Sequence, residues 1–505
     1  MSGKLEQLRA QEITVGTGQD ETQAMGSTRL DRSDMDRMGK VQELKRNFRP
    51  LSALSFCAVL QATWEFMLIS NSEGLQNGGL AGLFWTYVWT LIGAPTSGGQ
   101  YHWVSEFGPQ QHQKFLSYVT GWMAVLAWQA GAASGSFLTG TIIQGLIIIR
   151  DSDYMPQAWQ GTLFVFAMVL VIYIFNVYVA SWMPRIQNAL LVLHVFCWVA
   201  IVIVLWAMAP HQSASAVFTQ FNNGGGWSTM GVSLMIGQIS AIYGSLSSDA
   251  TAHMSEEVRD ASRYVPIAIT WGYIGNGLLA LVLLITFEFA IPSLEDALND
   301  PSGFPFIYVF KNAVPVAGIN GLTAIILIPV IFSNILFNAS TARQTYAFAR
   351  DKGLPFSKWI SHVDPKRQLP VNAIALSCLI SALLAIINIG SSTAFNAIIS
   401  LNVAALMFTY SMSLGCVIYR RICHPETLPP KRWSLGKWGL PTNIIAILYV
   451  IFAIFWSFWP SDTPTTLDTF NWSVVIFIGV LLISLFMYFV KGHREYVGPV
   501  VTVNR

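Results

Sequence analysis

Several ionisable residues fall inside apolar stretches of the sequence, where a charge is expensive, and three of them are considered first. Glu65 lies within QATWEFMLISN (61–71), His194 lies within a long apolar run, and Asp249 lies within YGSLSSDATAHMSEE (243–257). An ionised side chain at the centre of a membrane helix costs about 2.5 to 3.5 kcal/mol on insertion scales, so such residues usually mark a pathway or a binding site. These three positions indicate handling of a charged solute or of protons.

Each of the three residues also has a structural interpretation. Asp249 can be a polar residue at a helix end, and His194 can be a hydrogen-bonded core histidine, although histidine changes charge near physiological pH and so suits a proton carrier. An unpaired carboxylate at the depth of Glu65 is costly, so we favour a functional role there. We predict Glu65, His194 and Asp249 as candidates for proton coupling.

Weak helix formers gather around two of these positions. Small and hydroxyl side chains compete for backbone hydrogen bonds, and an interrupted membrane helix exposes N–H and C=O groups to a ligand. The strong cluster is Gly244, Ser245, Ser247 and Ser248, and a weaker one is Gln61, Thr63 and Glu65. The sequence therefore predicts two interrupted helices.

Aromatic residues lie near both predicted interruptions. They are Trp64, Trp122, Trp128 and Tyr243. Rings beside an acid suit an ammonium group through cation–π attraction. The chain has 18 Trp residues, however, and most tryptophans in membrane proteins serve packing or the interfacial belts. Ligand binding and packing both remain open for each ring.

The composition excludes an ordinary soluble enzyme. Of 505 residues, 53% are hydrophobic and 11% are charged, against roughly a quarter charged in an average soluble domain. The net charge of +2 gives no general indication of a nucleic-acid partner. The sequence contains no Walker loop, nucleophile elbow or dinucleotide fingerprint. We therefore expect no enzyme activity, no cofactor and no metal, and we expect an ion or solute gradient to supply the energy.

Twelve stretches are apolar enough, or nearly so, to form helices across a hydrocarbon core about 30 Å thick. They are 51–70, 80–94, 115–149, 162–180, 186–209, 230–252, 265–291, 321–348, 371–389, 395–419, 441–459 and 472–490. Lysine and arginine are retained on the cytoplasmic side of membranes. With the N-terminus inside, the outer loops contain only Arg150 and Lys311 of the 29 basic residues, which predicts that both termini are cytoplasmic.

The twelve stretches divide the chain into an all-α membrane domain and two tails. Residues 1–48 are polar and mixed in charge, so we expect a disordered cytoplasmic tail, and residues 491–505 form a second cytoplasmic tail. The transmembrane domain is predicted at 49–490. The first and sixth stretches start on opposite sides, which predicts inverted five-helix repeats at about 51–209 and 230–419, with extra helices at 441–490.

A short acidic motif follows the sixth stretch. His253 and Glu256 lie three apart in HMSEE, like part of a metal motif, but no second histidine completes it. We expect Glu256 and Glu257 to pair with Arg259 or Arg263 instead.

Several motifs resemble one family along nearly the whole chain. They are LQNGG (75–79), PTSGGQYHWVSEF (95–107), LSYVTGW, WQAGAASGSFLTGTIIQGL, VFTQFNNGGGW (217–227), SSDATAHMSEEVRDASRYVP (247–266), AFARDKGLP (347–355) and IGSSTAFNA (389–397). With these motifs the chain resembles the fungal amino-acid/choline transporters, including choline and GABA permeases, of the amino acid/polyamine/organocation superfamily.

This resemblance implies a LeuT-like 5+5 inverted-repeat fold of 12 transmembrane helices and a proton symporter at the plasma membrane. It places the unwound part of the first helix at Ala62, Thr63, Trp64 and Glu65, and that of the sixth at Tyr243, Gly244, Ser245 and Ser247. With Trp128, these are the predicted substrate-binding residues.

The sequence departs from the family pattern in two places. The second stretch, 80–94, is shorter than in the family and lacks an acidic residue there, and Ser247 replaces a frequent glycine of the wider superfamily.

The resulting hypothesis is a secondary active transporter that imports choline, amino acids or GABA by alternating access. Glu65 would balance the substrate's positive charge, and sodium is left open as an alternative to protons through Ser333 and Asn334. A transport-inactive nutrient sensor with the same fold is the competing interpretation. The partners expected are a small solute and the lipid bilayer, with no nucleic acid.

Overall fold

The computed structural model describes residues 26–37, 42–93, 101–151, 153–390, 394–428, 435–467 and 469–499. These residues are mainly helical, and β1 (Asn77–Gly78) pairs with β2 (Asn222–Asn223) in an antiparallel sheet. By length and composition, eight helical segments of the described chain can cross a membrane, and two shorter apolar helices accompany them. The chain is therefore a helical multi-pass membrane protein.

Each predicted apolar stretch falls on helical structure, although the number of twelve spans and their division into two inverted repeats stay predictions. The helices are α3 (Pro50–Gln61), α4 (Thr63–Ile69), α6 (Gly79–Gly93), α8 (Gln113–Arg150), α9 (Ala158–Ile174), α10 (Met183–Met208), α12 (Met230–Ser245), α13 (Ala250–His253), α14 (Ala261–Phe289), α17 (Val316–Arg350), α19 (Val371–Gly390), α20 (Ala394–Cys423), α21 (Gly439–Trp456) and α22 (Ser473–Met487). The short second helix, α6, has 15 residues as expected, and residues 94–100 lie outside the described part.

Shorter helices complete the chain. They are α2 (Arg29–Arg37), α5 (Ser72–Gln76), α7 (Tyr101–Phe107), α11 (Ala214–Thr219), α15 (Leu294–Leu298), α16 (Pro305–Ala313), α18 (Ser357–Ile360) and α23 (His493–Glu495). A π-helical turn at Phe175–Val179 and a 3-10 turn at Ala180–Trp182 connect α9 to α10.

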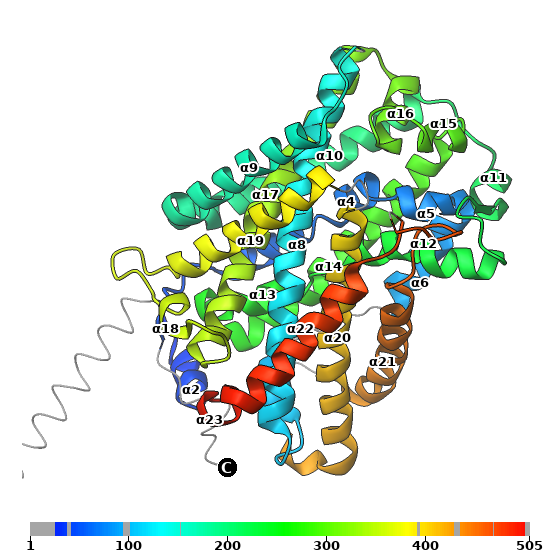
Figure 1. The fold of residues 1–505 in the computed structure, drawn as a ribbon. Coiled ribbons are helices and arrows are strands. Elements are labelled where there is room, and N and C mark those ends of the chain that lie inside the picture. The colour runs from blue at the N-terminus through cyan, green and yellow to red at the C-terminus, as the bar shows by residue number, and fades with distance from the viewer. Residues whose placement is uncertain are drawn as a thin grey trace, which may run out of the picture.

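The long helix α8 passes through the centre of the molecule (Figure 1) and packs mainly against α17 and α20. Around it, α3 packs against α14 and α10, while α12 packs against α6 and α5. Trp64 and Trp128 are among the largest fully buried side chains. The two predicted interruptions thus lie where helices from both halves of the chain meet.

Helices α2, α18 and α23 lie at one end of the molecule, and α11, α15 and α16 lie at the opposite end (Figure 1). The first of these ends contains the cluster of arginine and lysine residues at 343–367, so we call it the basic end. The two ends of the described chain are therefore on the same side, as the distribution of basic residues predicts.

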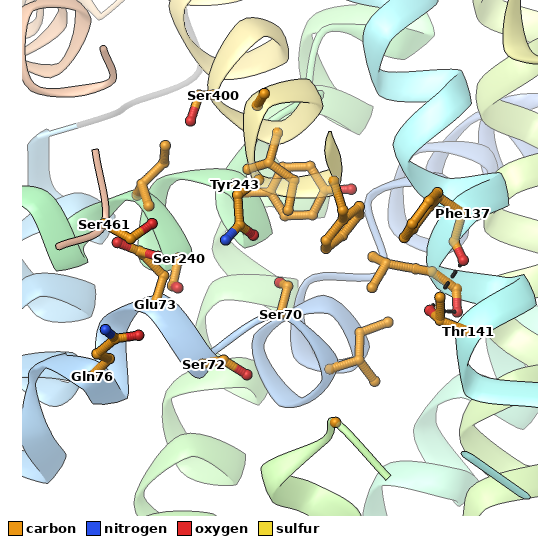
Figure 2. Close-up of a pocket in the computed structure, with 18 of the residues that line it drawn as sticks. Ser70, Ser72, Glu73, Gln76, Phe137, Thr141, Ser240, Tyr243, Ser400 and Ser461 are labelled. Atoms are coloured by element: carbon orange, nitrogen blue, oxygen red, sulfur yellow. Dashed lines mark hydrogen bonds between the residues drawn. The ribbon is translucent and has the colours of Figure 1, made fainter. Parts of the chain in front are cut away.

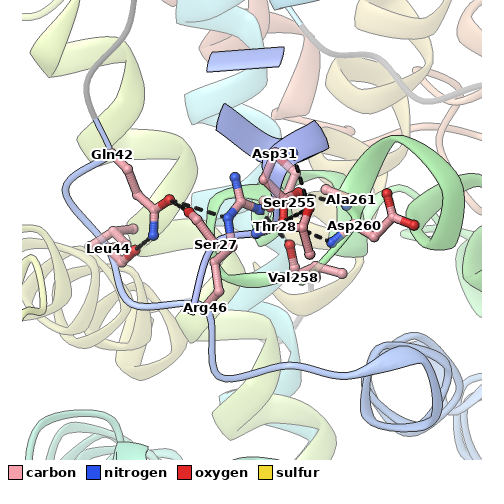
Figure 3. Close-up of polar contacts among 10 residues, drawn as sticks. All are labelled: Ser27, Thr28, Asp31, Gln42, Leu44, Arg46, Ser255, Val258, Asp260 and Ala261. Carbon is pink, nitrogen blue, oxygen red and sulfur yellow. Dashed lines mark hydrogen bonds and ion pairs between the residues drawn. The ribbon is translucent and has the colours of Figure 1, made fainter. Parts of the chain in front are cut away.

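The prediction of a disordered tail over residues 1–48 is wrong for residues 26–37 and 42–48. In this part of the chain, Arg46 forms an ion pair with Asp31 (3.4 Å) and donates a hydrogen bond to the carbonyl oxygen of Ser255 (3.1 Å) (Figure 3). Phe48 forms a parallel β-bridge with Val258. Residues 1–25 lie outside the described chain.

The segment is ordered because it supplies partners to the turn between α13 and α14. Asp31 is 2% exposed and accepts hydrogen bonds from the backbone N–H groups of Asp260 (3.1 Å) and Ala261 (3.3 Å). Burial raises the pKa of Asp31, but hydrogen bonds from Thr28 and Asp260 and the charge of Arg46 outweigh burial and lower it below its ordinary value. The polar composition of this segment predicted disorder because it carries no information about the turn between α13 and α14 on which the segment docks.

The acidic pair after α13 has different partners from those expected. Glu257 pairs with Arg343 (2.8 Å) and Glu256 pairs with Arg350 (2.7 Å), both on α17, rather than with Arg259 or Arg263. The Glu257–Arg343 pair is buried. The turn after α13 is therefore held on one side by α17 and on the other by the N-terminal segment.

Replacing Asp31 should release the N-terminal segment. Asp31→Asn removes the charge that faces Arg46 and weakens the two backbone hydrogen bonds, a loss of about 1 to 3 kcal/mol for a buried charged acceptor. We expect faster trypsin cleavage at Arg29, Arg32 or Lys45, measured by mass spectrometry on the purified protein. The exposed Asp36→Asn is the matched control, and equal cleavage of both variants would contradict this account.

Candidate functional site

The first interruption lies between α3 and α4. Helix α3 ends at Gln61, Ala62 adopts a left-handed conformation (φ 42°, ψ 45°), and α4 begins at Thr63. Left-handed backbone is unfavourable for an L-residue other than glycine by about 1 to 2 kcal/mol. The interruption at Ala62 confirms that this helix breaks, but the predicted extent of the unwound part is wrong, because Thr63, Trp64 and Glu65 are helical in α4.

The second interruption lies between α12 and α13. Helix α12 ends at Ser245, Leu246 is extended, and Ser247 has a φ of 70°. Gly244 precedes the break, and a Cβ atom there would lie 2.8 Å from the sulfur of Met67 on α4. The serine-rich sequence therefore does interrupt the sixth stretch, but the break begins later than predicted, because Tyr243, Gly244 and Ser245 are still helical. Gly244 serves close packing of α12 on α4.

Neighbouring side chains donate to carbonyl groups at these breaks. Ser333 donates to the carbonyl oxygen of Leu60 (2.5 Å), and Asn276 is a second donor to that of Ala58 (2.9 Å), which also accepts from the backbone N–H of Ala62 (3.0 Å). Gln61, at the first break, donates to the carbonyl oxygen of Ser245 at the second break (3.2 Å). Unpaired backbone groups are costly away from water, so these contacts stabilise both breaks and link them to each other.

A small cavity of about 20 Å³ lies between the two breaks. Such a volume is about enough for one water molecule, so the central cavity is too small to hold a larger solute in this conformation. The lining residues come from α3, α4, α8, α12, α17 and α20, and from the segment after α12: Leu60, Gln61, Phe66, Gly131, Gly135, Tyr243, Leu246, Ser247, Ser333, Asn334, Phe337 and Asn402.

A second cavity of about 560 Å³, drawn in Figure 2, is lined in part by residues 301–304, which lie between α15 and α16 at the end opposite the basic end. It reaches the surface near the exposed residues Pro301 and Gly303. Tyr243 lines both cavities, donates to or accepts from Ser134 (2.8 Å), and lies edge-on to Phe66 with ring centroids 5.7 Å apart. Tyr243 and Phe66 therefore separate the large cavity from the centre.

Glu65 and Trp64 point away from the small cavity, toward α10 and α14. Glu65 is fully buried, and its Oε1 lies 2.7 Å from His194 Nδ1. Trp64 Nε1 lies 3.1 Å from the same His194 atom, and His194 Nε2 lies 3.2 Å from Asn276 Oδ1. Glu65 Oε2 is buried without a hydrogen-bond partner in the described chain. Two of the predicted proton-coupling residues are thus in direct contact.

Asp249, the third predicted proton-coupling residue, lies elsewhere. It accepts a hydrogen bond from Tyr410 (2.8 Å) and lies 3.9 Å from His253 Nε2. The ring of Trp128 packs against the rings of His253 and Phe337, with centroids 4.6 and 4.8 Å apart. Asp249 and Trp128 line neither cavity, so the structure does not bring them together with Glu65.

Of the predicted substrate-binding residues, Tyr243 and Ser247 line the small cavity. Ala62 and Gly244 shape the breaks, and the Ser245 carbonyl contacts Gln61. Thr63, Trp64, Glu65 and Trp128 are buried and line neither cavity. Their substrate contacts stay predictions.

Sequence reasoning missed Phe66, Phe337 and Asn402 as cavity residues, and Gly131 and Gly135 also line this cavity. A Cβ atom at Gly135 would lie 2.7 Å from Asn334 Oδ1, so the glycines bring α8 against α17 beside the cavity. The spacing of small residues along 131–135 was the available signal.

The oxygen-bearing residues considered for sodium have protein partners. Ser333 donates to Leu60, and the side chain of Asn334 lies 2.9 Å from Ser136 Oγ. Among the described residues no group of three or more His, Cys, Asp or Glu side chains is placed to hold a metal ion.

Two interrupted helices that meet at a small buried cavity, with a larger cavity next to it, are typical of a membrane transporter. Residues 78–481 match the family model described as amino acid permease, and the chain belongs to this family.

Relatives along most of the chain have transport names. The choline transporter of Saccharomyces cerevisiae is 27% identical, with 92% of this chain and 85% of the relative covered. Amino-acid permease BAT1 of Arabidopsis thaliana is 28% identical, with 92% and 95% covered, and amino-acid permease 2 of Neurospora crassa is 23% identical, with 95% and 91% covered. The relatives are permeases and transporters, not enzymes, and they support the resemblance to fungal amino-acid/choline transporters.

The left-handed backbone at Ser247 should discriminate between substitutions. Ser247→Val places a β-branched side chain at φ 70° and should destabilise the protein by about 1 to 3 kcal/mol, whereas Ser247→Gly should retain its stability. The apparent Tm of the detergent-solubilised protein measures this difference. Ser248→Val, one residue further and also buried, is the control, and a loss no larger at Ser247 would contradict the assignment.

Proposed function

We propose that this permease is a secondary active transporter that imports a small ammonium-bearing solute, choline or an amino acid such as GABA, by alternating access. The observation that carries the proposal is the pair of linked helix breaks around a central cavity, which the ring of Tyr243 separates from a larger cavity toward the end opposite the basic end. The names of the relatives support choline and amino acids as the solute class.

In this proposal the basic end faces the cytoplasm of a plasma-membrane protein and the 560 Å³ cavity faces outward. Solute passes from that cavity to the centre when the Tyr243 and Phe66 rings move apart. The inner path is closed by the Arg343–Glu257 and Arg350–Glu256 pairs and by the docked N-terminal segment. Release inward then requires these contacts to separate.

The proposed coupling ion is a proton shared by Glu65 and His194. Asn276 uses its Nδ2 group as donor to Ala58 and Gln61, so its Oδ1 accepts from His194 Nε2–H. The remaining proton lies between Glu65 Oε1 and His194 Nδ1 and can reside on either atom.

The position of this proton changes the hydrogen bonding of α4. Trp64 Nε1–H can donate to His194 Nδ1 only when that nitrogen carries no proton. Transfer of the proton to Nδ1 therefore removes the acceptor of Trp64, which lies two residues after the break at Ala62. Proton transfer to His194 can therefore change the position of Trp64 and, with it, the backbone conformation at the first interruption.

Uptake measurements test the proposed function directly. In cells that lack their own permeases, the protein should produce saturable uptake of labelled choline, GABA or another amino acid, increased by an acidic exterior. Surface labelling controls for expression. If the protein reaches the surface and none of these solutes is taken up, the transporter proposal fails and the nutrient-sensor alternative, which the relatives do not support, gains ground.

The Glu65–His194 pair should control the pH dependence of uptake. Glu65→Gln and His194→Gln should each reduce proton-driven accumulation at least tenfold, an effect of about 1.4 kcal/mol or more. Solute exchange without a proton gradient should survive better than accumulation. Uptake at external pH 5 and 7 measures this. Glu288→Gln, another fully buried carboxyl, is the control, and an unchanged pH profile in Glu65→Gln would remove the pair from the coupling mechanism.

A further inference from the structure

Among the described residues, the lining of the large cavity includes two acidic side chains and no basic one. Glu73 and Asp462 are among its lining residues, which include no Lys, Arg or His. Its volume of about 560 Å³ falls in the range of small-molecule sites, about 300 to 1,000 Å³. The cavity thus has the size for a solute and an excess of negative charge.

The protein holds the carboxyl group of Glu73 in place with a neutral amide. Asn77 Nδ2 donates to Glu73 Oε1 (3.1 Å) and also to the carbonyl oxygen of Ser461 (2.8 Å), which connects α5 to the segment after α21. Figure 2 shows Glu73, Ser240 and Ser461 together on one wall of this cavity. The amide of Asn77 orients the carboxyl group and brings no positive charge to it.

Asp462 follows Ser461 directly and adds the second charge. Its Oδ1 atom is buried and has no hydrogen-bond partner in the described chain. A buried acceptor without a partner carries a desolvation penalty of about 1 to 3 kcal/mol or more when charged, and a cation in the cavity would offset it. A cation bound in this cavity would therefore interact favourably with both acids.

Aromatic rings supply the other walls. Trp456 and Trp459 lie on the side of Asp462, with ring centroids 5.0 Å apart, and Phe137 stacks on Phe395 at 5.0 Å. Aromatic faces attract ammonium groups, including quaternary ones that cannot donate hydrogen bonds. Carboxylates with aromatic walls are chemically suited to alkylammonium cations.

We infer that this cavity is a binding site for an alkylammonium cation, with Glu73 and Asp462 as its charge partners, and that it prefers such a cation to a zwitterion of similar size. A zwitterion brings its own carboxylate toward two others, with no basic side chain in the lining to receive it. Only the step in which the bound cation continues to the centre rests on the proposed transport function.

A structural role for Glu73 is the alternative, because its bond to Asn77 holds two segments together. Glu73→Gln separates the two roles, since glutamine retains an oxygen that accepts from Asn77 but removes the charge. Asp462→Asn makes the corresponding change at the second acid. Glu295→Gln, an exposed acid of α15 at the same end of the molecule, is the matched control for loss of one negative charge.

The test is equilibrium binding of labelled choline to the purified full-length protein, with unlabelled GABA as competitor. We expect the double Glu73→Gln, Asp462→Asn variant to bind choline roughly 5- to 20-fold more weakly, because a close opposite charge contributes strongly in a partly desolvated site. Glu295→Gln should bind as the unmodified protein does. GABA should compete at least tenfold more weakly than unlabelled choline.

Unchanged choline affinity in the double variant overturns the inference, and so does equal competition by GABA and choline. Parallel uptake measurements keep the two proposals apart. Charge-dependent binding without uptake supports the cavity as a cation site and rejects transport, whereas uptake with charge-independent binding supports transport and rejects the cation site.

Discussion

The requirement that buried backbone groups find partners determines the centre of this protein. Breaking a helix inside a membrane releases carbonyl and amide groups that water cannot reach. Here α3 and α12 both break, and Leu60, Ala58 and Ser245 receive side-chain donors from Ser333, Asn276 and Gln61. Several polar residues of the spanning helices therefore lie at the two breaks, where they donate hydrogen bonds to the backbone.

The same contacts place the ionisable pair beside the first break. Asn276 contacts both the end of α3 and the imidazole of His194, which in turn contacts Glu65 on α4. Asn276 therefore connects the protonatable pair directly to the backbone at the first break. The closed contacts at the basic end and the cavity at the opposite end give the molecule two different ends around this centre.

Much of this arrangement was predictable from local sequence, and the rest depends on contacts between distant segments. Gly244 with its neighbouring serines predicted the second break, because these residues weaken a helix by themselves. The partnership of Glu65 with His194 was not predictable, since 129 residues separate them and the pattern does not tell which helix faces which. Successive helical residues point about 100° apart, so Phe66 faces the cavity while Glu65 faces α10. The docked N-terminal segment was missed because its stability depends on the turn at 254–261.

The position of Tyr243 in the walls of both cavities has a thermodynamic consequence. A molecule that displaces this ring from one side alters the volume and shape offered on the other. Occupancies of the two compartments are then linked, and the influence of each on the other is equal in free energy. The affinity measured for a ligand in one cavity therefore depends on whether the other cavity is occupied.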